Sequence, residues 1–114
     1  MESIVKQALL YDFYGELLTE HQKSVYEDYI LNDIGLSEIA LERGISRQGV
    51  HDLVKRCGKI LEGYEEKLHL VEKFLKAKDE VANIEKLAIK LEETKDIELV
   101  KEITKITQSI LEEM

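Results

Sequence analysis

Apolar residues recur at the three- and four-residue spacing of a helix along most of the chain, and turn-forming stretches separate the stripes. This pattern predicts helices over residues 3–14, 20–31 and 37–43, and further helices from residue 47 onward. The chain has no proline and is rich in Leu, Ile, Glu and Lys, a composition that favours helices throughout. We therefore expect an all-α protein.

The first two predicted helices carry clear boundary signals. Gly15 is the expected end of the first helix, and Thr19 with Gln22 forms a Thr-x-x-Gln capping box at the start of the second. A turn is expected over residues 32–35. The inward-facing residues are predicted to be Ile4, Ala8, Leu9 and Tyr11 or Tyr14 in the first helix, and Val25, Tyr26, Tyr29 and Ile30 in the second.

Residues 36–60 have the pattern of a helix-turn-helix. Ser37 is the expected N-cap of its first helix, Gly44 suits a turn with positive φ, and Ser46 can cap its second helix. Ala40 is small enough to let the two helices cross closely. The apolar face of the second helix is predicted to consist of Val50, Leu53, Val54 and Cys57. We expect this second helix to enter a DNA major groove.

The outward side of the second helix is cationic, and all three arginines of the chain lie within the motif. Arg and Lys can pair with guanine in a major groove, and Gln can pair with adenine. Lys55, Arg56 and Lys59 lie late in the helix and suit phosphates better than bases. The predicted DNA-contacting residues are Arg43, Ser46, Arg47, Gln48, His51, Asp52, Lys55, Arg56 and Lys59. The alternative is an ordinary helical hairpin with a solvated basic face.

The net charge of −8 is unfavourable for DNA binding when taken alone. Residues 1–42 hold nine acidic and two basic residues, a net charge of −7. Residues 43–59 hold five basic residues and one acidic residue, a net charge of +4, and residues 60–114 have a net charge of −5. One positive window thus stands in an acidic protein, so we expect weak non-specific affinity for DNA and a strong dependence on salt.

Beyond the motif, the apolar residues keep a heptad spacing. They are Val50, Val54, Cys57, Leu61, Tyr64, Leu68, Val71 and Leu75. This spacing predicts that the second helix of the motif continues to about Lys78. Gly58 and Gly63 weaken such a helix, and Gly63 is a candidate position for a bend.

Two more helical segments are expected after Lys78, with a break around residues 93–96 and Thr94 as the N-cap of the last helix. Their apolar stripes need a partner, and a homodimer is the most economical source of one. The predicted interface consists of Val81, Ile84, Leu87, Leu91, Ile97, Val100, Ile103, Ile106 and Ile110. The alternative folds residues 64–114 back into an intramolecular bundle. The chain thus divides into a DNA-binding module over residues 1–63 and a dimerising extension over residues 64–114.

Several short motifs in about the first 70 residues together resemble the YlxM-type helix-turn-helix family. They are YDFYG near the start, LLTEHQ at the second helix, SEIA and SRQGVHDLVKR across the motif, and LEGYEEKL after it. The motif is also similar to the promoter-reading domain, region 4, of bacterial sigma factors. Arg43 departs from the pattern, because its position is usually apolar in such motifs.

The resemblance implies an all-helical protein with a DNA-binding or regulatory role. It implies that Ser46, Arg47, Gln48 and His51 face the nucleic acid. It also implies a link to the signal recognition particle, which is inferred from the proximity of the genes and is therefore an associational argument.

Other classes of function find little support in the sequence. His21, His51 and His69 lack the close spacing of a zinc site, so we expect no metal. No Gly-rich phosphate loop or nucleophile elbow occurs, so we expect neither a cofactor nor an enzymatic activity. The absence of a long apolar run and of a signal-peptide pattern leads us to expect a cytoplasmic protein. Cys57 is the only cysteine, and we expect it to be a buried structural thiol.

Three functions follow from these patterns. The first is a sequence-specific regulator that binds double-stranded DNA. The second is a helical adaptor that contacts signal recognition particle components without binding DNA, an option motivated by the acidic charge and the apolar C-terminal helices. RNA binding is the third and weakest, because no platform of stacking aromatic residues accompanies the basic window.

Overall fold

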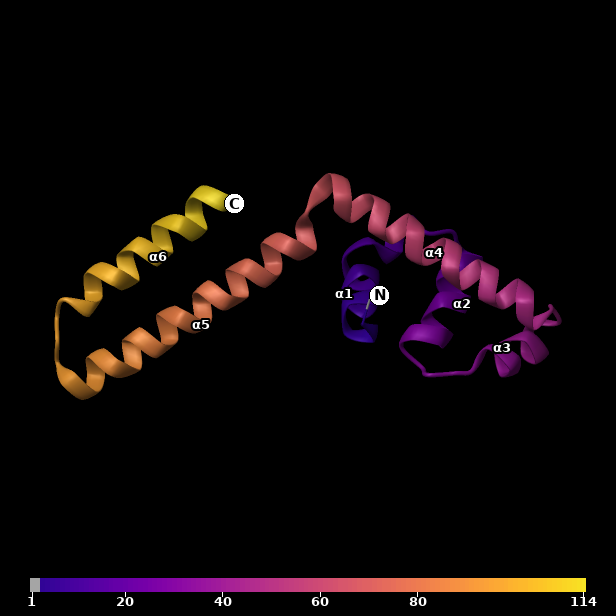
Figure 1. The fold of residues 1–114 in the computed structure, drawn as a ribbon, viewed down its shortest axis with the longest axis horizontal. Helices are drawn as coiled ribbons and strands as arrows, with labels where there is room; N and C mark the ends of the chain where they lie inside the picture. The colour runs from indigo at the N-terminus through magenta and orange to yellow at the C-terminus, as the bar shows by residue number, and fades with distance from the viewer. Residues whose placement is uncertain (1–2) are drawn as a thin grey trace. The chain divides into compact units, whose positions relative to one another are not determined.

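The computed structural model describes residues 3–114, and within this range it contains helices and no strand (Figure 1). The elements are α1 (Ile4–Tyr14), the 3-10 helix η1 (Gly15–Leu17), α2 (Glu20–Ile30), α3 (Leu36–Arg43), α4 (Arg47–Leu68), α5 (Leu70–Thr94) and α6 (Leu99–Glu113). The predicted all-α class is confirmed. No helix within residues 3–114 is at once long enough and apolar enough to cross a membrane.

The chain forms two compact units, one ending at Val71 and the other spanning Glu72–Met114. The sequence placed the boundary earlier, after residue 63. The first unit extends further because Val71 is buried in its core and the ring of Tyr64 stacks on that of Tyr14 at 6.0 Å. The last turns of α4 are therefore part of the helix-turn-helix unit.

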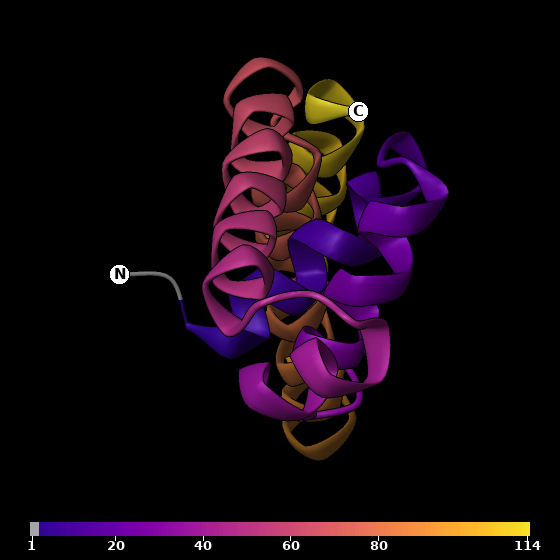
Figure 2. The same ribbon diagram turned by 90° about the vertical axis from the view of Figure 1, so that its right-hand side faces the viewer.

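In the first unit, α4 packs against α1, α2 and α3, and Figures 1 and 2 show α1 and α2 on the same side of it. One core cluster joins α1, α2 and α4 and consists of Leu10, Tyr11, Tyr14, Leu18, Tyr26, Ile30, Cys57, Leu61 and Val71. A second cluster lies at the crossing of α2, α3 and α4 and consists of Val25, Ile39, Ala40 and Val50. The predicted stripe of α1 was partly wrong: Ile4 is exposed, and Leu10 is buried instead.

The helix boundaries predicted from local signals are mostly confirmed. The Thr19 hydroxyl accepts from the Gln22 N–H, and the Gln22 side chain accepts from the Thr19 N–H, which completes the capping box. Ser37 as the N-cap of α3 was wrong, because α3 begins at Leu36 and its N-cap is Gly35, with no side-chain hydrogen bond. The N-cap lies two residues earlier than predicted, which places Ser37 inside the first turn.

The long helix predicted from the heptad pattern is broken at His69, whose φ of 57° is left-handed. The helix passes through Gly63 and ends at Leu68. The Tyr14 hydroxyl donates to Glu65 at 2.6 Å and accepts from the Leu70 N–H at 3.1 Å, so side chains of the first unit cap the start of the next helix. The apolar spacing continues across this break, which explains why the pattern did not reveal it.

The second unit is a helical hairpin in which α6 runs back along α5 (Figure 1). An ion pair between Lys76 and Glu113 joins the two helices. Thr94 as the N-cap of α6 was wrong, because its hydroxyl bonds Lys90 and Asp96 around the end of α5 and α6 begins at Leu99. Residues 72–114 thus form a two-helix hairpin, and the choice between a dimer and an intramolecular bundle over residues 64–114 stays a prediction.

Candidate nucleic-acid interface

The turn between α3 and α4 is built by two local devices. Gly44 has a φ of 67°, a left-handed conformation that suits glycine, and it ends α3. Ser46 then starts α4, where its hydroxyl accepts from the Gly49 N–H at 2.9 Å. Ile39, Ala40 and Val50 are buried between the two helices. This arrangement fixes the second helix of the motif, α4, against α3 and leaves its other side open.

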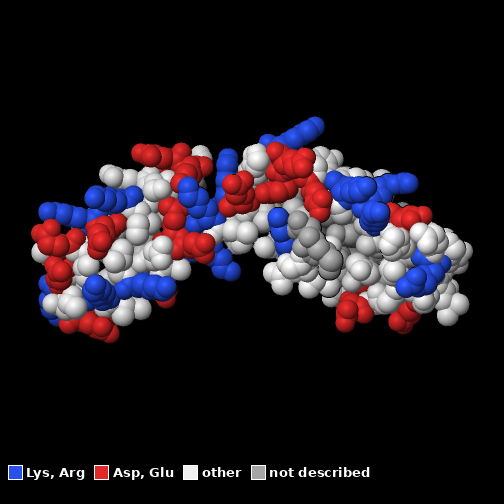
Figure 3. Space-filling view, in the orientation of Figure 1, with Lys and Arg blue, Asp and Glu red and all other residues white. Residues whose placement is uncertain are grey.

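The predicted contact residues of α4 lie together on that open side. Every one of them is exposed: Arg47, Gln48, His51, Asp52, Lys55, Arg56 and Lys59, with Ser46 just before them. Figure 3 shows Lys and Arg side chains gathered over this part of α4. Within residues 3–114, Arg47, Lys55, Arg56 and Lys59 form neither an ion pair nor a side-chain hydrogen bond. Four cations are therefore available to an anionic partner.

Asp52 organises the polar residues at the start of α4. Its Oδ1 accepts from the Gln48 side-chain amide at 3.0 Å and lies 3.6 Å from the Nδ1 of His51. A carboxylate beside these cations lowers the positive charge of the face, so Asp52 does not add to its attraction for an anion. Asp52 instead positions its neighbours, because these contacts restrict the rotamers of Gln48 and His51.

Arg43 does not belong to this surface. Its guanidinium donates to the Asp28 carboxylate at 2.7 Å and reaches the backbone oxygen of Ser24 at 3.5 Å. The sequence reading counted Arg43 among the DNA contacts, but the side chain is half-buried and links α3 to α2. The Arg43 bond, followed by the Asn32 bond, holds the pKa of Asp28 below its usual range. Arg43 therefore acts in the fold of the module.

A hollow of about 370 Å³ borders α4 on the side where α2 begins. Its lining includes His21 and Gln22 from the first turn of α2 and Asp52 and Arg56 from α4. The sequence reading considered His21 only as a metal ligand and missed this position. The capped start of α2 and the cation of Arg56 thus border the same hollow.

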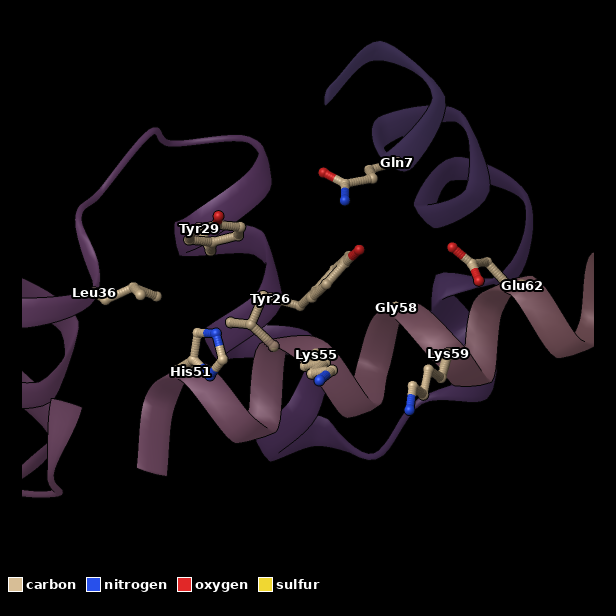
Figure 4. Close-up of a pocket in the computed structure, with 10 residues that line it drawn as sticks. Gln7, Tyr26, Tyr29, Leu36, His51, Lys55, Gly58, Lys59 and Glu62 are labelled. Atoms are coloured by element: carbon tan, nitrogen blue, oxygen red, sulfur yellow. The ribbon is translucent and has the colours of Figure 1, made fainter. Parts of the chain in front are cut away.

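A second pocket, of about 310 Å³, lies along the other edge of the cationic face (Figure 4). Its lining on α4 includes His51, Lys55, Gly58 and Lys59. The rest of the lining comes from α1, α2, α3 and further along α4, and consists of Gln7, Tyr26, Tyr29, Leu36, Val54 and Glu62. The sequence predicted Tyr26 and Tyr29 as ordinary inward residues, and it gave no signal for a cavity beside them.

The comparisons with known proteins agree with the helical fold. Residues 1–109 match the family model described as "Putative helix-turn-helix protein, YlxM / p13 like". The resemblance stated from the sequence motifs is thus confirmed, and it extends well past the first 70 residues.

Curated relatives are similar over most of their length. A UPF0122 protein of Thermoanaerobacter sp. (strain X514) is 45% identical over 105 residues, which cover 91% of this chain and 90% of the relative. A UPF0122 protein of Acetivibrio thermocellus is 39% identical over 116 residues, covering 98% of this chain and 99% of the relative. One from Bacillus velezensis is 44% identical over 93 residues, covering 82% and 84%.

Proposed function

Because the chain belongs to the YlxM/p13-like helix-turn-helix family, we propose that it binds double-stranded DNA and regulates transcription through the exposed face of α4. The observation that carries the proposal is the set of four unpaired cations on one side of a helix that a Gly44–Ser46 turn holds against α3. Binding to chromosomal DNA would place the protein in the cytoplasm.

The position of each residue along α4 suggests its role. Arg47 and Gln48 lie in the first turn, the part of such a helix that approaches base edges. Lys55, Arg56 and Lys59 lie in the third and fourth turns and suit the phosphates that flank the groove. With so few cations and an acidic remainder, affinity is expected to be weak, and it should still fall as salt rises because phosphate contacts release counterions.

The proposal is tested by selecting bound sequences from random duplexes and then titrating the selected duplex with variants. Arg47→Ala should relax sequence preference and weaken binding by about fivefold to 150-fold, equivalent to ~1–3 kcal/mol for a lost base contact. Lys55→Ala should weaken binding to all duplexes and reduce the salt slope by about 1. Lys67→Ala is the matched control, because Lys67 is exposed in the last turn of the same helix.

Failure of the wild-type protein to shift any duplex at about micromolar concentration and low salt would reject DNA binding. Equal losses for Lys55→Ala and Lys67→Ala would place the contact away from the predicted face. Both results are readable without knowing the natural target.

We further propose that a second copy of the chain covers the hairpin of α5 and α6. Of the predicted interface residues, Val81, Ile97 and Val100 are exposed, and six more are only half-buried: Ile84, Leu87, Leu91, Ile103, Ile106 and Ile110. Two helices alone cannot enclose these side chains, and a two-fold copy supplies a surface with the same need. Two α4 helices would then read two half-sites.

Sedimentation equilibrium of the wild type and of a Val81→Asp, Val100→Asp double variant tests this assembly. We expect a wild-type dimer and a variant monomer with unchanged helicity. A wild-type monomer at about 100 μM would reject the dimer, and it would leave the α4 proposal standing, because DNA binding is measured separately.

The alternative function is an adaptor that contacts components of the signal recognition particle and does not bind DNA. The exposed Ile97 and Val100, in a chain of net charge −8, favour it. It predicts capture of the purified particle GTPase or its RNA, lost in Ile97→Asp and unaffected in Arg47→Ala. Capture that survives Ile97→Asp would count against the hairpin as the docking surface.

A further inference from the structure

The hydroxyl of Tyr26 forms the floor of the pocket in Figure 4. Tyr26 is 1% exposed, and its hydroxyl makes no hydrogen bond to any residue in the range 3–114. Figure 4 shows this hydroxyl pointing into the pocket. A group that enters the pocket can therefore bond this hydroxyl without displacing another partner.

Gly58 keeps this floor open. It lies inside α4, where glycine costs about 1 kcal/mol relative to alanine. A Cβ at this position would stand 3.8 Å from the Tyr26 hydroxyl oxygen and in no tighter contact, so the helix could accommodate a side chain here. Any side chain longer than alanine would extend from that Cβ into the pocket. A long side chain at position 58 should therefore be compatible with the fold but should fill the pocket.

The walls of the pocket are of two kinds. Leu36 and Val54 with the half-buried ring of Tyr29 form an apolar wall. Lys55 and Lys59 stand one helical turn apart on the rim, both exposed and both without an acidic partner within residues 3–114. Gln7 and Glu62 lie on the α1 side of the opening and offer an amide and a carboxylate (Figure 4).

We propose that this pocket binds a mononucleotide, with the base against the apolar wall and the phosphate on Lys55 and Lys59. The Tyr26 hydroxyl, the Gln7 amide and the Glu62 carboxylate then face the polar edge of the base and the ribose hydroxyls. A planar ring with a dianionic group matches an apolar wall beside two cations, and a simple aromatic acid leaves the other polar groups unused. The cavity of about 310 Å³ is at the lower end for ligand sites, which favours one nucleotide over a dinucleotide.

A nucleotide in this pocket also has a regulatory consequence, which rests on the proposed DNA binding. It occupies Lys55, Lys59 and His51, and all three belong to the face offered to DNA. Ligand and duplex then compete for the same cations, and each weakens the other by the same factor. The protein would release DNA when the nucleotide is abundant.

Calorimetric titration of the full-length protein with ribonucleoside mono- and diphosphates tests the site directly, with nucleosides and inorganic phosphate as probes of each half. We expect at least one nucleotide to bind more tightly than about 1 mM, with its nucleoside and phosphate at least tenfold weaker. No heat from any nucleotide at that concentration, or phosphate binding as tightly as the nucleotides, overturns the proposal.

Variants of the pocket residues test whether the nucleotide binds in this pocket. Gly58→Leu should abolish it, Lys55→Ala should weaken it about tenfold, and Tyr26→Phe should weaken it about threefold to tenfold, the value of one hydrogen bond. Lys67→Ala is the matched control. Binding that survives Gly58→Leu in a folded protein, judged by unchanged circular dichroism, overturns the site even if a nucleotide binds elsewhere. Nucleotide binding without competition against duplex rejects only the DNA part.

Discussion

The two units of this protein differ in how much of their apolar surface they cover. Of the fourteen buried apolar residues in the described chain, thirteen lie at or before Val71, and Leu99 alone lies in the hairpin. The hairpin leaves Val81, Ile89, Ile97 and Leu111 more than half exposed. The difference teaches that the same helical spacing produces a closed core where four helices meet and an open surface where two do.

The polar contacts repeat this contrast. In the first unit, tertiary hydrogen bonds join distant parts of the chain: Tyr11 to Glu27, Tyr14 to Glu65 and Arg43 to Asp28. In the hairpin, the ion pair of Lys76 with Glu113 is exposed, and exposed pairs contribute about 0–1 kcal/mol. The first unit should therefore respond strongly to single changes, and the hairpin weakly.

Leu61→Ala should have the largest effect. Leu61 is fully buried on α4 in the cluster that holds Leu10 and Tyr14, so its truncation removes apolar contacts and leaves a cavity. We expect a loss of about 2–5 kcal/mol in the free energy of unfolding, measured by urea denaturation with circular dichroism. A loss under about 1 kcal/mol would mean that the core of the first unit is not as closed as its burial indicates.

Tyr14→Phe should have the next largest effect. The hydroxyl links Glu65 to the Leu70 N–H, and its removal takes one partner from each. We expect a loss of about 1–3 kcal/mol in the free energy of unfolding. Tyr26→Phe is the matched control, since that hydroxyl has no hydrogen bond within residues 3–114, and the expected change is below about 0.5 kcal/mol. Equal losses would contradict the role of the Tyr14 bonds.

Alkaline pH should destabilise the first unit. Burial, then the Glu65 hydrogen bond, raises the pKa of Tyr14, and burial, then the Glu27 hydrogen bond, raises that of Tyr11. A folded-state pKa above the unfolded value of about 10 means that the stabilisation is complete below pH 10 and is lost as the pH rises further. Urea unfolding between neutral pH and pH 11 should show this fall, and a Tyr11→Phe, Tyr14→Phe double variant should show a shallower one.

Ile89→Ala should have the smallest effect. Ile89 lies on α5, is 53% exposed and is outside the proposed dimer interface. Its truncation should change the free energy of unfolding by less than about 0.5 kcal/mol. A loss comparable to that of Leu61→Ala would show that something in solution covers this side of the hairpin, and the contrast between the units would then disappear.

Features that depend on neighbouring residues could be predicted from the sequence. The Thr19–Gln22 capping box, the left-handed Gly44 and the Ser46 cap all rest on bonds that span four residues or fewer, and all three are confirmed. The exposed face of α4 follows from the same helical spacing, so its residues were also identified correctly as a group.

Features that depend on distant residues could not be predicted. The break at His69 is stabilised by Tyr14, 56 positions before its partner Leu70, and a heptad pattern carries no trace of that contact. The half-buried position of Arg43, a predicted DNA contact, depends on its bond to Asp28, fifteen positions away. The pocket needs four helices to surround it, and the sequence offered only Gly58, which was interpreted as a weak point in a helix.

The burial of the single cysteine makes it a probe of core opening. Cys57 is fully enclosed in the core of the first unit, and burial raises the pKa of its thiol, so the folded protein should resist alkylating reagents. Modification would then proceed only through transient opening of that core, and its rate would count those openings. Alkylation of this single thiol, followed by mass spectrometry, would therefore measure how often the core of the first unit opens.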